Sequence, residues 1–462
     1  MNEPPVMNWW ERIGRDEPVW APAPPWSTLA EPPNGPLQDI PAGRGGPNWD
    51  RPDSAADDHK PRRSRVRRAL VVAAAVAVGI GATLAVQALI GDDEPGRAAS
   101  SVPADGSVIE LRGHLDSVHT AAFSPDGSLA LTAAADGRII VWDAQNGDRL
   151  TTIGETGDYV ATARFDSTSS RILAVVNGDV AIIDAETGED EASISESADV
   201  TSAVLTDRDA AVVGYTFDPD SYASVETAVT RWDAATGDEL STIDEGAFPE
   251  ALSADGELVA LSTSDDEGST ITEIWNVADA SVQSTLDVVQ EFVYYADGAA
   301  FSDDGNRIAR VTSEYTEESF EALTSVWDAA TGDLLATLDD PAAGDVVSVV
   351  FDHSGDIVMT TAFGSDFFTS TLTLWNAESG ERIRTITREA VGGAAFSPDN
   401  SVIAVATADS TITIWDTESG DEVAVLAGHI GAINSIDFSP NGRRLVTASN
   451  DGTARIWDLD LG

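Results

Sequence analysis

The sequence predicts an all-β fold: an eight-bladed β-propeller of four-stranded blades, closed by pairing of an N-terminal strand with the last blade. One transmembrane helix and a disordered N-terminal tail precede it. Three observations lead to this prediction. A unit of about 44 residues recurs eight times over residues 107–462, a length typical of propeller blades. Its strands alternate in hydropathy with period two. Residues 69–90 carry no charge and follow a basic cluster.

Composition excludes several classes of function. The 462 residues hold 26 Lys and Arg against 79 Asp and Glu, and no Cys. The net charge of −53 lies entirely beyond residue 90, so phosphate backbones would be repelled and nonspecific nucleic-acid binding is excluded as a main activity; we expect no nucleic-acid partner. The lack of Cys excludes disulfides, thiolate metal sites and Cys nucleophiles. The Arg-over-Lys, Ala-rich, acidic composition resembles that of a high-GC bacterium.

Residues 1–68 are predicted to be a disordered cytoplasmic tail that ends in a basic juxtamembrane cluster. Residues 1–59 hold 12 of the 21 prolines and show almost no apolar periodicity, so they bury too little surface to fold. They also hold five tryptophans. Two interpretations stay open: a docking motif for a cytoplasmic partner, around residues 9–13, or a tail that touches the membrane interface or has no role.

Residues 69–90 are predicted to form a transmembrane helix. These 22 residues would extend about 33 Å, enough for a bilayer core. Basic residues at 60–68 precede them and acidic residues at 92–94 follow, which places the N-terminus in the cytoplasm. A cleaved signal peptide is the alternative, but about 60 residues before the basic region are too many for one. Residues 91–106 read as a linker.

The eight units from residue 107 onward share the same landmarks. Each has an apolar strand, a Ser-Pro-Asp-Gly-like turn, two further strands, and a Trp-Asp-like pair before a Thr-Gly-Asp-like turn. The Trp-Asp-like pairs begin at Trp142, Ile183, Trp232, Trp275, Trp327, Trp375, Trp415 and Trp457. The chain ends after this strand of the eighth unit, and a spare strand, residues 107–111, precedes the first unit. We expect the spare strand to complete the last blade and close the ring.

These features resemble the WD40 repeat family over about 356 residues, most strongly in the first and last units, where Gly-His pairs precede Trp-Asp. The resemblance implies a buried hydrogen-bond network of His, Thr, Asp and Trp, whose members satisfy one another. It maps onto His114, Thr132, Asp136 and Trp142, and onto His429, Thr447, Asp451 and Trp457. The middle units depart from the pattern, with Val405 at the Thr position of the seventh. The middle blades could therefore belong to a related propeller family, such as the quinoprotein-like repeats, and this alternative stays open.

Four consecutive units have a longer hairpin between their second and third strands. If the family resemblance holds, these hairpins rise on one face of the ring as a wall that binds a partner. The wall residues are Tyr215, Phe217, Asp218, Asp220, Tyr222, Asp265, Asp266, Glu267, Tyr315, Glu317, Glu318, Phe320, Phe363, Asp366, Phe367 and Phe368. Aromatics provide rigid contact area, and carboxylates would select a cationic protein or cell-envelope ligand. The alternative is that harmless insertions accumulate in exposed loops.

The sequence carries no catalytic constellation, and we expect neither a cofactor nor a metal. No His pair has metal-ligand spacing, and no nucleophile elbow or phosphate loop appears. Calcium binding by the acidic loops stays open, although no Asp-x-Asp-x-Asp-Gly loop occurs. The expected function is a non-enzymatic, single-pass cell-membrane protein that presents its propeller outside the membrane for binding. The alternatives are an exported propeller enzyme, a lyase or quinoprotein-like, using Arg231, His353 and Arg388 at the channel mouth, and signalling through the tail. The sequence leaves the oligomeric state open.

Overall fold

The computed structural model describes residues 107–459, except for 195–198, 206–210, 218–226, 244–246, 265–269, 287–297, 316–319, 340–344, 364–368 and 390. The predicted tail (1–68), transmembrane helix (69–90) and linker (91–106) therefore lie outside the described residues. Every element within the described ranges is a β-strand. None of the described residues belongs to a helix that is long and apolar enough to cross a membrane.

The strands form eight four-stranded antiparallel sheets in the described part of the chain, which confirms the predicted all-β architecture of four-stranded units. The first four sheets in chain order are β2 (Val118–Phe123), β3 (Leu129–Ala134), β4 (Ile139–Asp143) and β5 (Arg149–Ile153); β6 (Val160–Phe165), β7 (Arg171–Val176), β8 (Asp179–Asp184) and β9 (Asp190–Ile194); β10 (Asp199–Leu205), β11 (Ala211–Phe217), β12 (Thr227–Asp233) and β13 (Glu239–Ile243); and β14 (Phe248–Leu252), β15 (Leu258–Ser264), β16 (Thr270–Asn276) and β17 (Ser281–Leu286).

The next three sheets are β18 (Ala299–Phe301), β19 (Arg307–Tyr315), β20 (Phe320–Asp328) and β21 (Leu334–Leu338); β22 (Asp345–Phe351), β23 (Ile357–Phe363), β24 (Thr369–Asn376) and β25 (Arg382–Glu389); and β26 (Val391–Phe396), β27 (Val402–Thr407), β28 (Thr411–Asp416) and β29 (Glu422–Ala427). The last sheet, which we call the seam sheet, joins both ends of the described chain: β30 (Ile433–Phe438), β31 (Arg444–Ser449), β32 (Thr453–Asp458) and β1 (Val108–Arg112).

Pairing of β1 with β32 completes the seam sheet. The two strands run antiparallel, with Val108 opposite Trp457 and Arg112 opposite Thr453. The spare strand expected at residues 107–111 is thus found one residue later, beside the strand to which the sequence assigned it. Its N–H and C=O groups supply the hydrogen bonds that β32 would otherwise lack on that edge.

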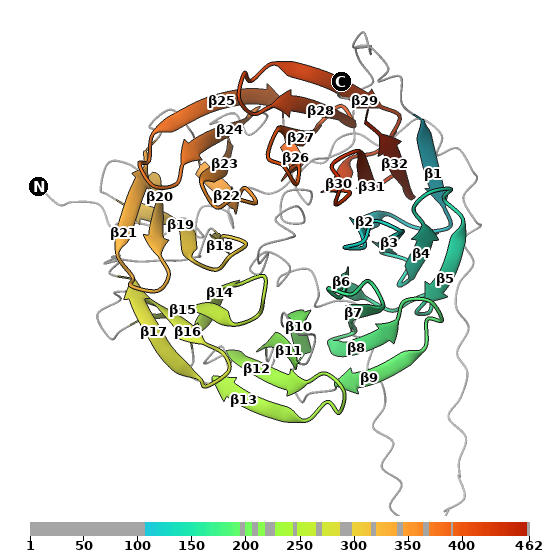
Figure 1. Ribbon diagram of the computed structural model, residues 1–462, viewed down its shortest axis with the longest axis horizontal. Coiled ribbons are helices and arrows are strands. Elements are labelled where there is room, and N and C mark those ends of the chain that lie inside the picture. The colour runs from blue at the N-terminus through green and yellow to red at the C-terminus, as the bar shows by residue number, and fades with distance from the viewer. Residues whose placement is uncertain are drawn as a thin grey trace, which may run out of the picture. The chain divides into compact units, whose positions relative to one another are not determined.

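The eight sheets lie side by side around a ring, with one strand of each facing the centre and one at the perimeter (Figure 1). Successive strands within a sheet are antiparallel. The hairpins from second to third strand and the loops that enter each innermost strand therefore emerge on the same side of the ring. We call this side the hairpin face.

Short polar turns join the first and second strands. In the first sheet the Ser124 hydroxyl donates to Asp126 at 2.7 Å and accepts the Leu129 N–H at 2.9 Å. Gly127 takes a φ of +71° there, a conformation that costs glycine little. The same Ser hydroxyl contact recurs at Ser397 and, with Asn in place of Asp, at Ser439.

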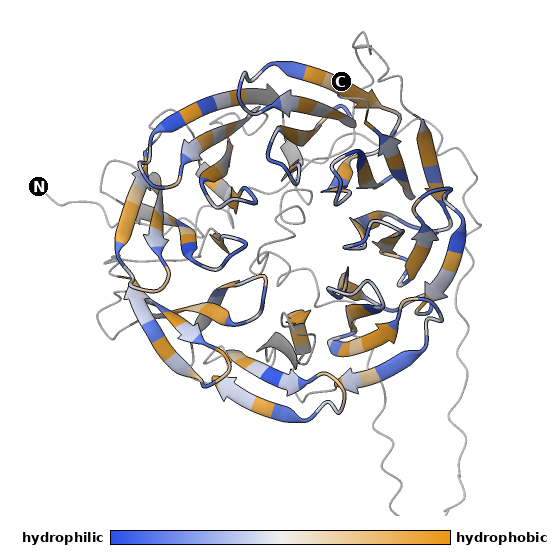
Figure 2. Cartoon of the chain, in the orientation of Figure 1, coloured by the Kyte–Doolittle hydropathy of each residue, from blue (hydrophilic) through white to orange (hydrophobic). Residues whose placement is uncertain are grey.

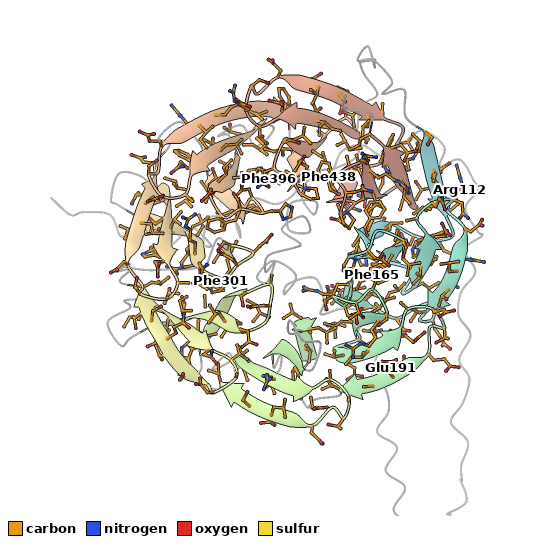
Figure 3. The ribbon with its side chains drawn as sticks, in the orientation of Figure 1. Arg112, Phe165, Glu191, Phe301, Phe396 and Phe438 are labelled. Carbon is orange, nitrogen blue, oxygen red and sulfur yellow. The ribbon has the colours of Figure 1, made fainter. Side chains whose placement is uncertain are left out.

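The core lies between neighbouring sheets. Trp142 of the first sheet packs with Ala448 and Ile456 of the seam sheet, and Trp457 packs with Ile412 of the preceding sheet. The outer strands show polar and apolar residues in turn, as expected for strands with one buried face (Figure 2). Phenylalanines end several innermost strands, including those labelled in Figure 3. Each sheet buries its apolar faces only against its neighbours, so the stability of each depends on the others.

Candidate functional site

The first sheet contains the polar network expected from the sequence. The Trp142 indole N–H donates to the Thr132 hydroxyl at 2.9 Å, and that hydroxyl lies 2.8 Å from His114 Nε2. His114 Nδ1 is 3.1 Å from Asp136, whose carboxylate also accepts the Leu115 N–H at 2.8 Å. One chain of hydrogen bonds therefore runs from the indole to the carboxylate and leaves none of these groups unpaired.

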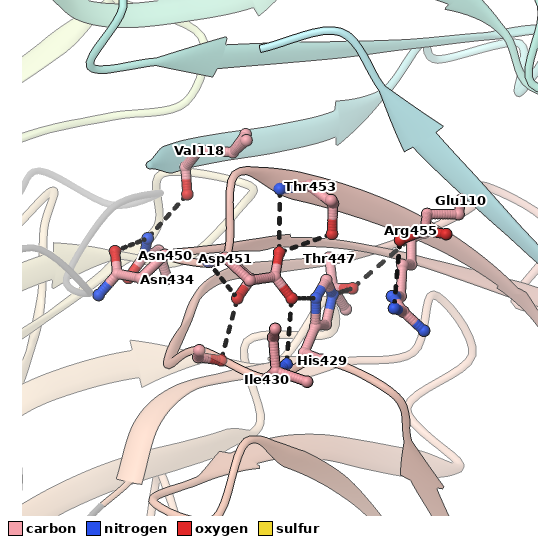
Figure 4. A network of polar contacts seen from close by, with 12 residues as sticks. Glu110, Val118, His429, Ile430, Asn434, Thr447, Asn450, Asp451, Thr453 and Arg455 are labelled. Carbon is pink, nitrogen blue, oxygen red and sulfur yellow. Dashed lines mark hydrogen bonds and ion pairs between the residues drawn. The ribbon is translucent and has the colours of Figure 1, made fainter. Parts of the chain in front are cut away.

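The seam sheet repeats this network, and Figure 4 shows the part formed by His429, Thr447 and Asp451. The Trp457 N–H donates to Thr447 at 3.0 Å, Thr447 lies 2.8 Å from His429 Nε2, and His429 Nδ1 lies 2.8 Å from Asp451. Asp451 also accepts from the Ile430 N–H and from the Thr453 hydroxyl. The structure thus brings together each of the two predicted sets of four residues.

The hydrogen-bond chain assigns the imidazole tautomer. Each Asp carboxylate can only accept, so His Nδ1 carries a proton and donates it to the carboxylate; with Nε2 unprotonated, the Thr hydroxyl accepts from the indole and donates to Nε2. Both imidazoles are then neutral. In agreement, burial lowers the pKa of His114 and of His429, although Asp136 and Asp451 act to raise it.

The network carboxylate of the seam sheet stays ionised. Burial acts to raise the pKa of Asp451, but hydrogen bonds from Thr453, His429 and Ile430 outweigh it and lower the pKa to about 2. Burial also acts to raise the pKa of Asp136, but hydrogen bonds from the Leu115 N–H and from His114 outweigh burial and lower this pKa.

The junction between the seam sheet and the first sheet carries further polar contacts. Side chains of β30 pair with backbone groups of β2: Asn434 donates to the Val118 carbonyl at 2.7 Å, and Asp437 accepts the Phe123 N–H at 2.7 Å. Within the seam sheet, Arg455 of β32 forms an ion pair with Glu110 of β1 at 3.3 Å. Polar contacts therefore hold the two ends of the described chain together.

The middle sheets use different polar pairs, which the sequence did not suggest to us. Trp375 donates to Thr360 at 2.9 Å, so the sixth sheet keeps half of the network. In the fifth sheet Arg310 occupies the register position of Thr132, counted from the Trp on the adjacent strand. It forms two hydrogen bonds with Glu250 of the fourth sheet, at 2.6 and 2.7 Å, and both side chains are only 1% exposed. A signal was present in the sequence: an Arg flanked by the apolar residues Ile308, Ala309 and Val311.

The four long hairpins are placed where their spacing predicted. The strand pairs β11–β12, β15–β16, β19–β20 and β23–β24 have seven to nine residues per strand, whereas β3–β4 and its counterparts in the other sheets have five or six. Each joins the second strand of its sheet to the third, so all four open on the hairpin face. Five of the predicted wall residues belong to these strands: Tyr215, Phe217, Tyr315, Phe320 and Phe363. The others, Asp218, Asp220, Tyr222, Asp265, Asp266, Glu267, Glu317, Glu318, Asp366, Phe367 and Phe368, lie outside the described residues.

The structure does not gather the residues that a channel-mouth enzyme would need. Arg231 lies on β12, the third strand of its sheet. His353 lies in the turn after β22, where its Nδ1 is 2.8 Å from Asp303. Arg388 lies on β25, the outermost strand of the sheet that contains β22. Among the described residues, no group of three or more His, Asp or Glu side chains is arranged to hold a metal ion.

Comparison with known families identifies three of the repeats. The family described as WD domain, G-beta repeat matches residues 106–143, 380–416 and 420–458. Two of these matches cover the units that contain the complete networks. The WD40 resemblance stated from the sequence is therefore confirmed.

Curated relatives match over single repeats. Periodic tryptophan protein 2 of Saccharomyces cerevisiae is 47% identical over 45 residues, which is 10% of this chain and 5% of that protein. One of the subunits of chromatin assembly factor 1 of Mus musculus is 34% identical over 56 residues, which is 12% of this chain and 10% of that protein. The chain thus spans a small fraction of either relative.

Solved structures match over about three quarters of the chain. The computationally designed Ika8 protein aligns with a TM-score of 0.59 at 21% identity, covering 76% of this chain and 98% of that chain. The C-terminal WD40 domain of Sif2 aligns with a TM-score of 0.58 at 11% identity and the same coverage. At these identities the likeness concerns the fold alone.

Proposed function

We propose that this chain, a WD40-repeat protein, is a single-pass membrane protein that presents a closed eight-bladed propeller outside the membrane to bind a protein or cell-envelope ligand. One observation supports the binding role most strongly. The long hairpins between second and third strands belong to four consecutive sheets and open on one face. Insertions scattered at random would not favour adjacent sheets and the same connection in each.

The proposal of eight blades rests on the sheets and on their closure. The described residues supply eight sheets of four strands, and β1 completes the last of them. Apolar clusters join the seam sheet to its neighbour on each side. A ring closed in this way is a rigid base, so a hairpin wall built on it loses little entropy when it binds.

The proposal of a membrane anchor rests on the sequence before the propeller. Residues 69–90 hold no charge, the basic cluster precedes them and acidic residues follow. The acidic residues of the hairpins favour a cationic partner.

Capture of the partner tests the binding role. The full chain, purified in detergent and immobilised, is exposed to envelope extract beside a variant in which all four hairpins are replaced by the short turn of residues 134–137. We expect a partner that the native chain retains and the variant does not. The variant must keep the thermal unfolding midpoint of the native chain. Equal retention by both chains would contradict the proposed role of the wall.

A further inference from the structure

A groove opens on the hairpin face at the junction of the seam sheet and the first sheet, away from the four long hairpins. It has a volume of about 390 Å³ and lies between the loop from β1 to β2 and the hairpin from β31 to β32. Its walls are Arg112, Gly113, His114, Leu115, Asp116 and Ser117 on one side, and Asn450, Asp451, Gly452 and Thr453 on the other.

Both walls are held from below by the polar networks. His114 and the Leu115 N–H both bond to Asp136, which fixes the loop. Asp451 bonds to His429, to the Ile430 N–H and to Thr453, which fixes the hairpin. A groove with fixed walls requires little ordering when a ligand enters, so more of the contact energy remains as affinity.

Large aliphatic side chains stand exposed around this groove. Leu115 is 71% exposed on one wall, and Ile430, whose N–H bonds to Asp451 of the opposite wall, is 91% exposed. These two residues follow the histidines of the two networks, so they hold equivalent positions in neighbouring sheets. Exposed aliphatic side chains on rigid loops beside a groove provide contact area for a partner.

The charge of the groove is negative. Asp116 and Asp451 both line it, and the pKa of about 2 keeps Asp451 ionised at neutral pH. The single cation of the lining, Arg112, forms an ion pair with Glu110 at 2.9 Å. The acidic charge of the chain beyond residue 90 adds to this field. A cationic ligand is therefore attracted and an anionic one repelled.

We propose that this groove is a second docking site, which takes a short extended segment of another protein that carries both basic and aliphatic side chains. The aliphatic side chains pack on Leu115 and Ile430, and the basic ones face the exposed Asp116, while the covered carboxylate of Asp451 adds only its negative charge. The site uses none of the residues of the long hairpins, so it goes beyond the proposed function and stands without it.

Fluorescence anisotropy of a labelled hexapeptide that alternates lysine and leucine tests this site on the full chain. We expect the lysine–leucine peptide to bind more tightly than a lysine–serine or a glutamate–leucine peptide of the same length. The variant L115S/D116K weakens binding by about tenfold or more, the scale of a contact at the centre of an interface. A second variant, Ile430→Ser, weakens it in the same direction. All three positions are exposed, so the variants keep the fold.

The outer strand offers a matched control. Asp333 and Leu334, the latter 57% exposed, lie side by side at the perimeter, so D333K/L334S makes the same changes of charge and apolar area away from the groove. We expect this variant, and the variant with shortened hairpins, to bind the peptide within about twofold of the native chain. Equal weakening by L115S/D116K and D333K/L334S, or no weakening by L115S/D116K, would overturn the proposal.

Discussion

The hydroxyl of Thr447 is the group on which the seam network depends most directly. It accepts the Trp457 N–H at 3.0 Å, lies 2.8 Å from His429 Nε2, and is fully buried. Thr447→Val keeps the shape of the side chain and removes only the hydroxyl. Two polar groups, the indole N–H and the imidazole Nε2, then lose their partner inside the protein.

The expected cost follows from those two groups. A buried polar group without a partner costs about 1–3 kcal/mol, so the free energy of unfolding should fall by roughly 2–6 kcal/mol. Thr447→Ser is the control, since it keeps the hydroxyl and removes one methyl group, at a cost of roughly 1 kcal/mol. The difference in the free energy of unfolding between the two variants therefore measures the contribution of the hydrogen-bond network apart from that of packing.

Urea unfolding of the full chain, followed by tryptophan fluorescence and far-ultraviolet circular dichroism, measures both variants. We expect the midpoint of Thr447→Val to lie well below that of Thr447→Ser, with coincident transitions by the two probes. Equal midpoints for the two variants would refute the reasoning, because the hydroxyl would then contribute nothing beyond its volume.

Two further predictions concern buried charge. Because burial lowers the folded-state pKa of His429, the unfolded chain takes up this proton first, so the contribution of His429 to stability is full above about pH 6.5 and is lost as the pH drops below that value. Burial raises the pKa of Asp437 to about 6 and Asp303 raises the pKa of His353, so these two groups act in the opposite direction over the same range. Between pH 7 and pH 5 the native chain should therefore lose more stability than a His429→Gln variant, and equal changes in the two melting temperatures would contradict the neutral imidazole. The pKa of Asp451, about 2, adds a loss of stability below about pH 3.9. Glu250→Gln leaves the Arg310 guanidinium buried without its counter-ion and should lower the free energy of unfolding in urea by about 3–5 kcal/mol. Glu250→Leu combined with Arg310→Met should recover most of that loss. A Glu250→Gln variant as stable as the native chain would contradict a buried ion pair between these two residues.

The sequence predicts most of the ring because its repeats carry local signals. Turns such as Ser124 to Gly127 have the residues that the turn geometry requires, and the Trp-Asp pairs mark the third strand of each sheet. The partner of β1 also follows from the sequence, because the last unit lacks a strand and the chain has a spare one. The two complete networks follow from the Gly-His and Trp-Asp spacing.

The sequence does not predict contacts that depend on how two different sheets face each other. Glu250 and Arg310 are 60 positions apart, on strands with no pattern in common, and only the packing of the fourth sheet on the fifth brings them together. The groove beside Leu115 is likewise formed by two loops from opposite ends of the described chain. Period and turn chemistry describe one sheet at a time, so they identify neither the partner of Arg310 nor the two loops that form the groove.

The most direct test of the proposed membrane arrangement uses the absence of cysteine from the chain. Single-cysteine variants, Gln145→Cys on an exposed turn of the first sheet and Ser27→Cys in the tail, are treated with a membrane-impermeant maleimide on intact cells, or on spheroplasts where an outer membrane is present. We predict that Gln145→Cys is labelled at once and Ser27→Cys only after the membrane is permeabilised. Labelling of Ser27→Cys alone, or of neither before permeabilisation, would contradict a propeller presented outside the membrane.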